Sequence, residues 1–454
     1  MADILIHADR RIGRVRPLHG VNNGPVCYGS LLDVTHYYKR AGIPLVRLHD
    51  PNWPNAREVD IYTIFPDFDK DPEDPASYDF SRTDEYIRTV LETGAKIVYR
   101  LGVSIEHTKQ KYYVDPPQDF AKWAQICIGI IRHYNHGWAN GFHANIEYWE
   151  IWNEPDKPVG KTNLMWGGTW EQFYELYGVA AKAIKRFDPS LKVGGYGATS
   201  VKVKTFMNGF LSYCRDHDVP LDFFSWHVYG ADLRRFVDES RYARQELDRY
   251  GFTQTESHLN EWNYFDGDFK TIWLPENEFV RRGVFERMKS HIGASFVAAA
   301  LIRLQDLPID AANYYDGQPT ALFCGLFDYY GVPQKAYYAV ESFQRLCEYS
   351  ARVEALVDPS LSGGVYGLAA ADDGGEAAAL ISNVTGPARH YAIRIDGLGS
   401  GEGGGAREYV CEQYRLDDQH TMQLVGSERV RSAEHEIRLF LPAHSVLLIR
   451  LIGV

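Results

Sequence analysis

Residues Tyr148–Asp156 read YWEIWNEPD, and this segment sets the pattern for most of the chain. Its successive side chains alternate between two faces and are mostly aromatic or β-branched, which predicts a β-strand. Pro155 has no backbone N–H to continue a ladder, so the strand must stop there and Glu154 must lie at its C-terminal end. A segment of helical period lies on each side, at 117–134 and 170–187. A strand between two helices is the repeating unit of a parallel sheet.

Both flanking helices carry signals of their own. In the first, apolar residues recur with the helical period: Phe120, Trp123, Ala124, Cys127, Ile130 and Ile131. The second follows Thr169, an N-cap residue, and Gln172 three positions later completes the pattern of a capping box. Gly94 precedes another apolar segment, where the end of a helix requires a left-handed residue.

Seven further segments resemble the first strand in length and composition, and helical patterns separate them. The eight expected strands are Leu18–Val21, Leu45–His49, Lys96–Leu101, Glu147–Trp152, Lys192–Gly194, Phe223–His227, His258–Trp262 and Ala311–Tyr315. Eight strands that alternate with helices over about 330 residues predict a closed (β/α)8 TIM barrel of the α/β class. A doubly wound open sheet is the alternative, which the lack of a GxGxxG motif after the first strand disfavours.

The sequence changes character after about Tyr349. Glycine-rich turns separate short alternating segments that predict a C-terminal antiparallel β-sandwich: Gly364–Leu368, Ala378–Ser382, Tyr391–Ile395, Tyr409–Tyr414, Ile437–Leu441 and Val446–Leu451. The expected domains are a barrel over 15–347 and a sandwich over 348–454, with residues 1–14 supplying one more strand to the sandwich. Ser400–Gly405, SGEGGG, is expected to form the tip of a hairpin.

Composition excludes several classes of protein. Of 454 residues, 45% are hydrophobic and 24% are charged, which is the balance of a folded globular protein. A net charge of −12 argues against a nucleic-acid partner. The sequence shows neither an apolar run of roughly 18 residues nor a secretion signal, so no membrane partner and a cytoplasmic location are expected. The six cysteines lack CxxC spacing and the histidines form no HExxH pattern, which predicts reduced thiols, no metal and no cofactor.

A second segment ends in the same way as the first. His258–Tyr264, HLNEWNY, carries Glu261 directly after Asn260. If the strand count holds, Glu154 ends the fourth strand and Glu261 ends the seventh, so both lie at the C-terminal face of the barrel, where this fold holds its active sites. Two carboxyl groups across one barrel mouth can cleave a glycosidic bond, because one donates a proton while the other attacks the anomeric carbon. An ordinary Asn-Glu-Pro turn is the structural alternative for the first of them.

Neighbouring residues suggest how these two acids are supported. Trp149 and Trp152 are expected to exclude solvent from Glu154, which raises the pKa of that carboxyl group and favours a general acid.

His227 and Tyr229, two apart in SWHVY, could orient the attacking carboxylate or could simply pack in the core. Arg47 and His49 share one face of the second strand. Arg47 is expected to support Glu261, since a buried arginine needs a carboxylate partner.

Three motifs, WEIWNEPD, SWHVY and HLNEWN, resemble in order and spacing the fourth-, sixth- and seventh-strand motifs of glycoside hydrolase family 39 of clan A, the family of β-xylosidases and α-L-iduronidase. The segment GVPQKAYYAVESFQRL at Gly331–Leu346 is also similar, so the resemblance covers the barrel and, more loosely, the sandwich. It implies a retaining double displacement in which Glu154 is the acid/base and Glu261 the nucleophile.

The resemblance also implies roles for the residues around the two acids. Asn153 would bind the sugar 2-hydroxyl, and Arg47 would support the site. Further substrate-binding residues would be His49, His227, Tyr229 and Trp262. The eighth strand departs from the family, because Ala311–Asp316 reads AANYYD and lacks the tryptophan that usually floors the pocket.

The expected function is an intracellular exo-glycosidase that removes terminal pentosides from an oligosaccharide or small glycoside. A β-D-xylosidase acting on xylo-oligosaccharides, in xylan degradation, is favoured. The alternatives are an arabinosidase, another glycosidase of the same family, or a non-catalytic carbohydrate-binding barrel, against which the pair Glu154 and Glu261 argues. A homo-oligomer is left open.

Overall fold

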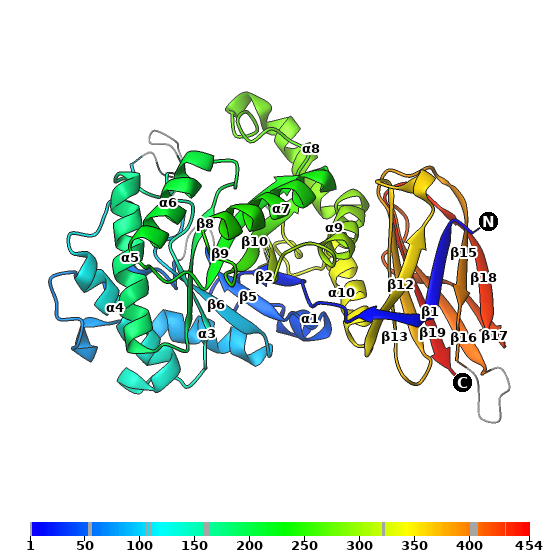
Figure 1. Ribbon diagram of the computed structural model, residues 1–454, viewed down its shortest axis with the longest axis horizontal. Coiled ribbons are helices and arrows are strands. Elements are labelled where there is room, and N and C mark those ends of the chain that lie inside the picture. The colour runs from blue at the N-terminus through cyan, green and yellow to red at the C-terminus, as the bar shows by residue number, and fades with distance from the viewer. Residues whose placement is uncertain are drawn as a thin grey trace.

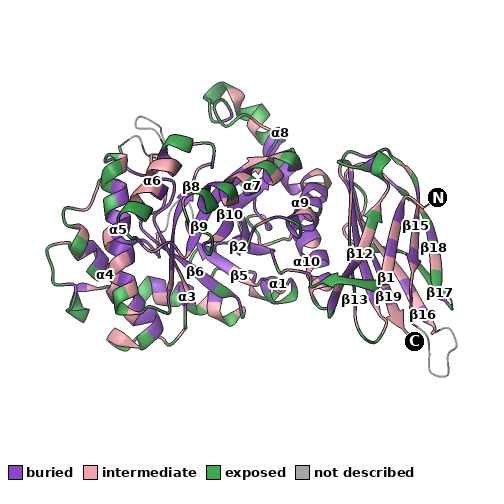
Figure 2. Cartoon of the chain, viewed as in Figure 1, coloured by how far each residue is buried: buried purple, intermediate pink, exposed green. Residues whose placement is uncertain are grey.

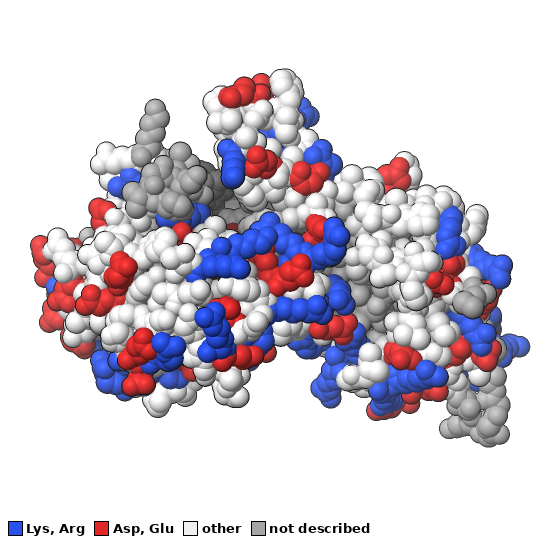
Figure 3. All heavy atoms as spheres, turned by 45° about the horizontal axis from the view of Figure 1, so that its top comes forward, with Lys and Arg blue, Asp and Glu red and all other residues white. Residues whose placement is uncertain are grey.

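The computed structural model describes residues 2–52, 57–105, 108, 110–157, 164–319, 323–399, 407–431 and 433–454. The chain forms a barrel of alternating strands and helices and, beside it, a large β-sheet that holds both termini (Figure 1). Basic and acidic side chains are interspersed over the face drawn in Figure 3. Within the described ranges, none of the helices is both long enough and apolar enough to span a lipid bilayer.

The barrel strands are β2 (Gly20–Asn22), β5 (Leu45–Leu48), β6 (Lys96–Leu101), β7 (Tyr148–Ile151), β8 (Lys192–Ala198), β9 (Phe223–Gly230), β10 (Glu256–Tyr264) and β11 (Ala311–Tyr314). They pair in parallel and close in the order β10-β11-β2-β5-β6-β7-β8-β9. Each expected strand matches one of these, so the predicted (β/α)8 barrel is confirmed. The strands are buried along nearly their whole length, because helices cover their outer faces (Figure 2).

The helices that follow the barrel strands carry their apolar residues on one face, except α9, which is apolar nearly all round. They are α3 (Ser81–Glu92), α4 (Phe120–His136), α5 (Trp170–Phe187), α6 (Lys204–Asp216), α7 (Leu233–Arg249), α9 (His291–Leu304) and α10 (Lys335–Cys347). The connections contain α1 (Thr35–Arg40), α2 (Ile61–Ile64), α8 (Glu278–Lys289) and a two-stranded ladder of β3 (Val26–Cys27) and β4 (Leu32–Asp33). Helix α8 projects from the body of the barrel (Figure 1).

The expected helix ends are present. Thr169 Oγ1 accepts a hydrogen bond from the Gln172 backbone N–H at 3.2 Å, and Gln172 Oε1 accepts one from the Thr169 N–H at 2.9 Å. This capping box confirms where α5 begins. Gly94 follows α3 with a φ of +86°, the left-handed conformation expected for it.

The strands beside the barrel are β1 (Ile4–Gly13), β12 (Ala351–Val357), β13 (Val365–Ala371), β14 (Ala377–Asn383), β15 (Arg389–Asp396), β16 (Tyr409–Leu416), β17 (Gln423–Val430), β18 (Glu434–Leu441) and β19 (Ser445–Gly453). They form one nine-stranded sheet in the order β17-β16-β19-β14-β13-β12-β1-β15-β18. The pairing is antiparallel except between β1 and β15. A single apolar core holds residues from both halves of this sheet, so the sheet folds over itself into two layers. The hairpin tip expected at Ser400–Gly405 lies outside the described residues.

Helix α9 joins the barrel to the sheet. It is buried on nearly every side, because the barrel covers one face and β13, β14 and β19 cover the other. Ser382 Oγ on β14 donates a hydrogen bond of 2.7 Å to the Ser295 carbonyl on α9. Lys335 Nζ, at the start of α10, donates one of 3.0 Å to the His420 carbonyl between β16 and β17. The two bodies therefore share a packed interface as well as the chain connections.

Candidate active site

Glu154 and Glu261 meet at the C-terminal mouth of the barrel. Glu154 lies just after β7 and Glu261 lies within β10. One carboxylate oxygen of each lies within 4.8 Å of the other, with the His227 ring from β9 between them. Nδ1 of His227 is 3.1 Å from Glu154 Oε1, and its Nε2 is 3.6 Å from Glu261 Oε2. The fold thus brings together two acids that are more than a hundred residues apart in the chain.

The end of β7 is shaped to present Glu154. Trp152 and Glu154 have φ values of +70° and +48°, in the left-handed region that non-glycine residues adopt at an energetic cost. Backbone hydrogen bonds to both neighbouring strands hold this turn. The Trp152 N–H donates to the Leu101 carbonyl at 2.7 Å, and the Glu154 N–H donates to the Gly197 carbonyl at 2.9 Å. The carboxyl group is therefore fixed at the barrel mouth by the backbone of three strands.

Arg47, fully buried on β5, lies beneath the two acids. Its Nη1 is 3.2 Å from Glu261 Oε2, and its Nη2 donates a hydrogen bond of 2.7 Å to Asn153 Oδ1. Its shortest contact with a carboxylate, however, is to Glu150 Oε2, at 2.7 Å from Nε. Arg47 thus supports both Glu261 and Asn153 while its own charge is balanced mainly by Glu150.

Glu150 is a residue that the sequence reasoning missed. It is fully buried on β7, and its Oε1 accepts hydrogen bonds from Ser225 Oγ at 2.6 Å and from Asn260 Nδ2. With Arg47 on Oε2, each oxygen has at least one donor, as a buried carboxylate requires. The buried arginine on the second strand was the available signal, since it needs a carboxylate partner and Glu150 is an acid within the fourth strand.

Tyr229 orients the second oxygen of Glu261. The Tyr229 hydroxyl donates a hydrogen bond of 2.7 Å to Glu261 Oε1, while Arg47 contacts Oε2. The Tyr229 ring also contacts Phe269 and Phe323, with centroid separations of 5.5 and 6.0 Å. Phe269 is partly exposed, so an apolar wall extends from Glu261 toward the solvent.

Lys157 and His227 contact the two oxygens of the Glu154 carboxyl group. Lys157 Nζ lies against its Oε2, and His227 contacts its Oε1. Burial alone would raise the pKa of Glu154, but the Lys157 ammonium and His227 outweigh it and lower that pKa to about 2. From its aromatic neighbours, the sequence predicted a protonated Glu154. That prediction is wrong for the free protein, in which Glu154 is ionised.

The two tryptophans beside Glu154 in the sequence point elsewhere. Trp149 stacks on Tyr99 at a centroid distance of 5.1 Å, and Trp152 contacts Trp123 and Trp166 at 6.2 and 5.3 Å. Both rings belong to the packed core and both indole N–H groups donate to backbone carbonyls. The residue that controls the charge of Glu154 is Lys157, which the sequence reasoning did not single out.

Several polar atoms at the mouth have no hydrogen-bond partner among the described residues. They are Nδ1 and Nε2 of His49, Nε2 of His227 and Nδ2 of Asn153, although His49 Nε2 also lies 3.2 Å from Asp50 Oδ2. Burial, followed by the charges of Arg47 and Arg100, lowers the pKa of His49 well below its usual range, so its ring is neutral. Buried donors and acceptors of this kind are costly unless a ligand satisfies them. They suit the hydroxyl groups of a bound sugar.

A protein-family model, two curated proteins and several solved structures are similar to this chain. The family model for glycosyl hydrolases family 39 matches residues 30–260, just over half of the chain. The chain belongs to glycosyl hydrolase family 39. The match confirms the resemblance to this family and covers the first two motifs, on β7 and β9, but it ends at residue 260, just before Glu261.

Two β-xylosidases are among the relatives of this family 39 chain. The enzyme of Caldicellulosiruptor saccharolyticus is 26% identical over 290 residues, which are 60% of this chain and 57% of the relative. That of Geobacillus stearothermophilus is 26% identical over 265 residues, 51% of this chain and 48% of the relative. The chain thus spans about half the length of the curated relatives that it matches.

Solved structures match nearly the whole chain. A glucosidase from Croceicoccus marinus has a TM-score of 0.83 at 28% identity, covering 100% of this chain and 99% of that one. A monomeric β-xylosidase from Caulobacter crescentus has a TM-score of 0.71 at 18% identity, covering 99% of both chains. The second shares the fold, and its monomeric state gives no support to a homo-oligomer of this family 39 chain.

Trp262 is not placed to bind substrate, contrary to the expectation from sequence. It is fully buried on β10, where successive side chains alternate, so its ring points away from the face of Glu261. The ring packs edge-on against Phe236 of α7 and Tyr314 of β11, at 6.0 and 5.5 Å. In this family 39 chain Trp262 therefore fills the layer between strands and helices.

At the eighth strand, Tyr315 follows β11 at the barrel mouth. Its backbone N–H donates to the Trp262 carbonyl at 3.0 Å, and its carbonyl accepts from Asn263 Nδ2 at 2.7 Å. Burial raises the pKa of the Tyr315 hydroxyl well above its usual range, and the nearby charges of Asp50 and Glu261 add to the shift. Tyr315 is thus a nearly buried aromatic residue beside Glu261, at the end of the strand for which the sequence left the pocket floor open.

Proposed function

We propose that this family 39 protein is a retaining exo-glycosidase that removes a terminal sugar from short oligosaccharides or small glycosides. The observation that carries the proposal is the proximity of Glu154 and Glu261 oxygens, within 4.8 Å, on one barrel mouth. Retaining enzymes hold their two carboxyl groups about 5–5.5 Å apart, whereas inverting enzymes need about 6.5–9.5 Å to admit a water.

The reaction takes two displacements. Glu261 attacks the anomeric carbon as a carboxylate, and the glycosidic C–O bond breaks while Glu154 gives its proton to the leaving oxygen. A water molecule then attacks the same carbon, Glu154 takes one of its protons, and the bond to Glu261 breaks. Because Glu154 pairs with Lys157 in the free protein, the leaving group must displace that ammonium before Glu154 can act as an acid.

The surrounding residues would hold the sugar and the nucleophile. Asn153 Oδ1 is used by Arg47, so its free Nδ2 can donate to the sugar 2-hydroxyl. Tyr229 and Arg47 keep both oxygens of Glu261 in place. Nδ1 of His49 and Nε2 of His227, which form no hydrogen bond with the described residues, can bind further hydroxyl groups.

β-D-Xylosides are the substrate class we propose first, because two curated relatives are β-xylosidases. A glucoside is the second candidate, because the glucosidase of Croceicoccus marinus matches this chain over its full length. A cytoplasmic location suits short imported oligosaccharides, and cell fractionation would test it. The wall of Phe269 and Phe323 offers apolar surface to the C–H face of a sugar ring.

One experiment tests both mechanism and sugar. Proton NMR during hydrolysis of nitrophenyl β-D-xyloside and β-D-glucoside reveals the configuration of the first free sugar. We expect the β-anomer to appear before mutarotation, and Glu261→Gln to abolish its release. The proposal would be overturned if the α-anomer appeared first. It would also be overturned if no glycoside in a panel were hydrolysed faster with the protein than in buffer alone.

A further inference from the structure

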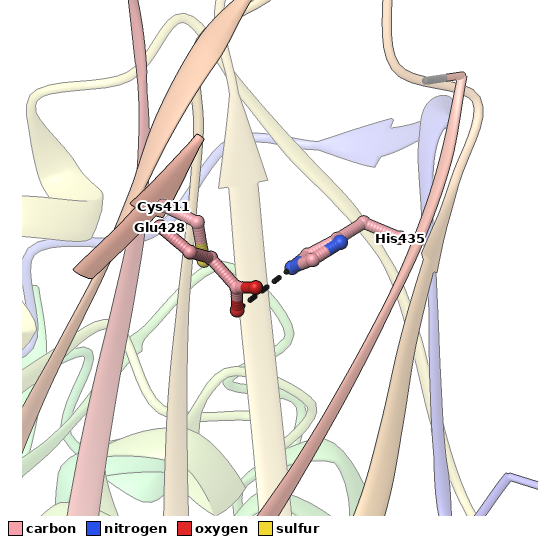
Figure 4. A group of neighbouring side chains, drawn as sticks. All are labelled: Cys411, Glu428 and His435. Carbon is pink, nitrogen blue, oxygen red and sulfur yellow. Dashed lines mark ion pairs between the residues drawn. The ribbon is translucent and has the colours of Figure 1, made fainter. Parts of the chain in front are cut away.

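Three side chains of metal-binding type converge in the sheet domain, away from the barrel mouth. They are Cys411 on β16, Glu428 on β17 and His435 on β18. One ligand-type atom of each lies within 4.8 Å of the other two. Figure 4 shows the carboxylate of Glu428 and the ring of His435 pointing toward each other, with the sulfur of Cys411 beside them.

The cluster lies where the chain crosses between the two layers. Strands β17 and β18 are the two edges of the nine-stranded sheet, so one lies at each end of the strand order. They are consecutive in the sequence, β17 ending at Val430 and β18 beginning at Glu434, yet β17 pairs with β16 and β18 pairs with β15. In Figure 4 the side chains reach across the space between these strands. A group bound here would therefore link the two layers at their open edge.

The existing contacts leave part of the cluster unsatisfied. His435 Nε2 is 3.3 Å from Glu428 Oε1 but is buried without a well-formed hydrogen bond to any described residue. Gln413 Nε2 donates to the same Glu428 oxygen at 3.3 Å. An ion pair joins His435 and Glu428, and the thiol of Cys411 lies beside them because Cys411 is opposite Glu428 in the β16–β17 ladder and is fully buried.

Thiolate, imidazole and carboxylate form the ligand set that Zn²⁺ prefers among common divalent ions. Bonds of about 2.0–2.3 Å in tetrahedral geometry place ligand atoms about 3.3–3.7 Å apart, so small side-chain rotations would close the cluster around an ion. Glu428 is about half exposed and provides a path for entry, while Cys411 is held inside the core. Water would complete the fourth position.

We propose that Cys411, Glu428 and His435 bind a thiophilic divalent cation of the Zn²⁺ type. The bound ion would cross-link β17 and β18, the two edge strands of the sheet. Binding would release the thiol proton of Cys411 to solvent as the Cys411 Sγ–metal bond forms. The site is independent of the proposed hydrolysis, since it lies in the sheet domain and shares no residue with the barrel mouth.

The full chain, stripped of metal with a chelator, is titrated with Zn²⁺ in a calorimeter, and Co²⁺ is used as a spectroscopic probe. We expect one ion per chain, a rise in the melting temperature, and a thiolate-to-Co²⁺ charge-transfer band. Cys411→Ser, which is nearly isosteric, should remove that band and weaken binding at least tenfold. His435→Asn, on the partly exposed strand β18, should weaken it similarly and guards against misfolding of the first variant.

Two controls separate this site from others. Cys347→Ser changes a half-buried thiol at the end of α10 and should leave the Co²⁺ band intact. Glu261→Gln alters the other described cluster of such side chains, Glu154, His227 and Glu261, and should also leave it intact. Absence of stoichiometric Zn²⁺ binding, or binding that survives Cys411→Ser but not Glu261→Gln, would overturn the inference.

Discussion

The ammonium of Lys157 lies directly against Oε2 of Glu154, three residues earlier in the same loop. Both side chains are nearly buried, so the attraction between them is only weakly screened by water. This contact and His227 hold the pKa of Glu154 at about 2 in the free protein. The group that we propose as the proton donor is thus kept ionised until something displaces Lys157.

Replacement of Lys157 by Met should therefore extend activity to higher pH. The lysine stabilises the ionised form of Glu154, so its loss raises that pKa and keeps the acid protonated further up the pH scale. We expect the alkaline limb of kcat/KM to move up by at least about one pH unit, measured on a substrate with a poor leaving group. Lys202→Met, which removes an exposed lysine paired with Glu239, is the control. If the alkaline limb of the pH profile were unchanged in Lys157→Met, the ion pair would not determine the pKa of Glu154.

Glu154→Ala should separate substrates by their leaving groups. A xylo-oligosaccharide needs protonation of its leaving oxygen, so its hydrolysis should fall by about 10²–10⁴-fold. A dinitrophenyl glycoside leaves without that proton, and the first step should be much less affected. Azide, which needs no general base, should then restore turnover by attacking the intermediate. Equal losses on both substrates would remove Glu154 from the acid role.

The barrel could be predicted from the sequence because each of its strands carries two signals. One is an apolar composition, and the other is the turn that follows the strand. Two strands of the sheet, β12 and β17, were missed for a physical reason. β17, QLVGSERV, is exposed along most of its length because it forms a sheet edge, so no buried face imposes an alternating pattern. β12, ARVEALV, buries only Ala351 and Val353, and its second half is partly exposed although it is mostly apolar. A strand that buries little apolar surface needs no alternation of apolar and polar residues, so it is hard to recognise in the sequence.

The same reasoning explains which site residues could be predicted. The meeting of Glu154 and Glu261 was predictable because Pro155 marks where the fourth strand ends and the same Asn-Glu step recurs in the seventh, although β10 continues beyond Glu261 to Tyr264. Lys157 was not, because its contact depends on the course of the loop after Pro155 and not on any periodicity. The protonation state of Glu154 was mispredicted for the same reason, since sequence neighbours need not be neighbours in space.

Removal of the buried charge of Arg47 should destabilise the fold as well as the site. Arg47→Met leaves the fully buried carboxylate of Glu150 without its cation, a loss that costs about 3–5 kcal/mol in comparable buried pairs. Urea unfolding should show this as a lower midpoint, together with a loss of activity. Arg234→Met removes an exposed arginine paired with Asp232 and should change stability by less than about 1 kcal/mol. Similar midpoints in the two variants would contradict the role assigned to Arg47.

The interface between barrel and sheet should make the chain unfold as one unit. We propose two domains, a barrel over 15–347 and a sandwich of 348–454 with 1–14, and they share α9 and an apolar face of β14. Leu380 on β14 is fully buried in the core cluster of the barrel, although it belongs to the sheet.

Leu380→Ala should cost about 2–5 kcal/mol and lower a single transition, because its cavity weakens the barrel and the sheet together. Leu356→Ala, at a half-exposed position of β12, should change stability by less than about 0.5 kcal/mol. Calorimetry measures the unfolding transition of the whole chain. Loss of glycosidase activity reports on the barrel, and proteolysis reports on the sheet. If the sheet of Leu380→Ala became protease-sensitive at a temperature at which activity persisted, the two domains would not be coupled through this face.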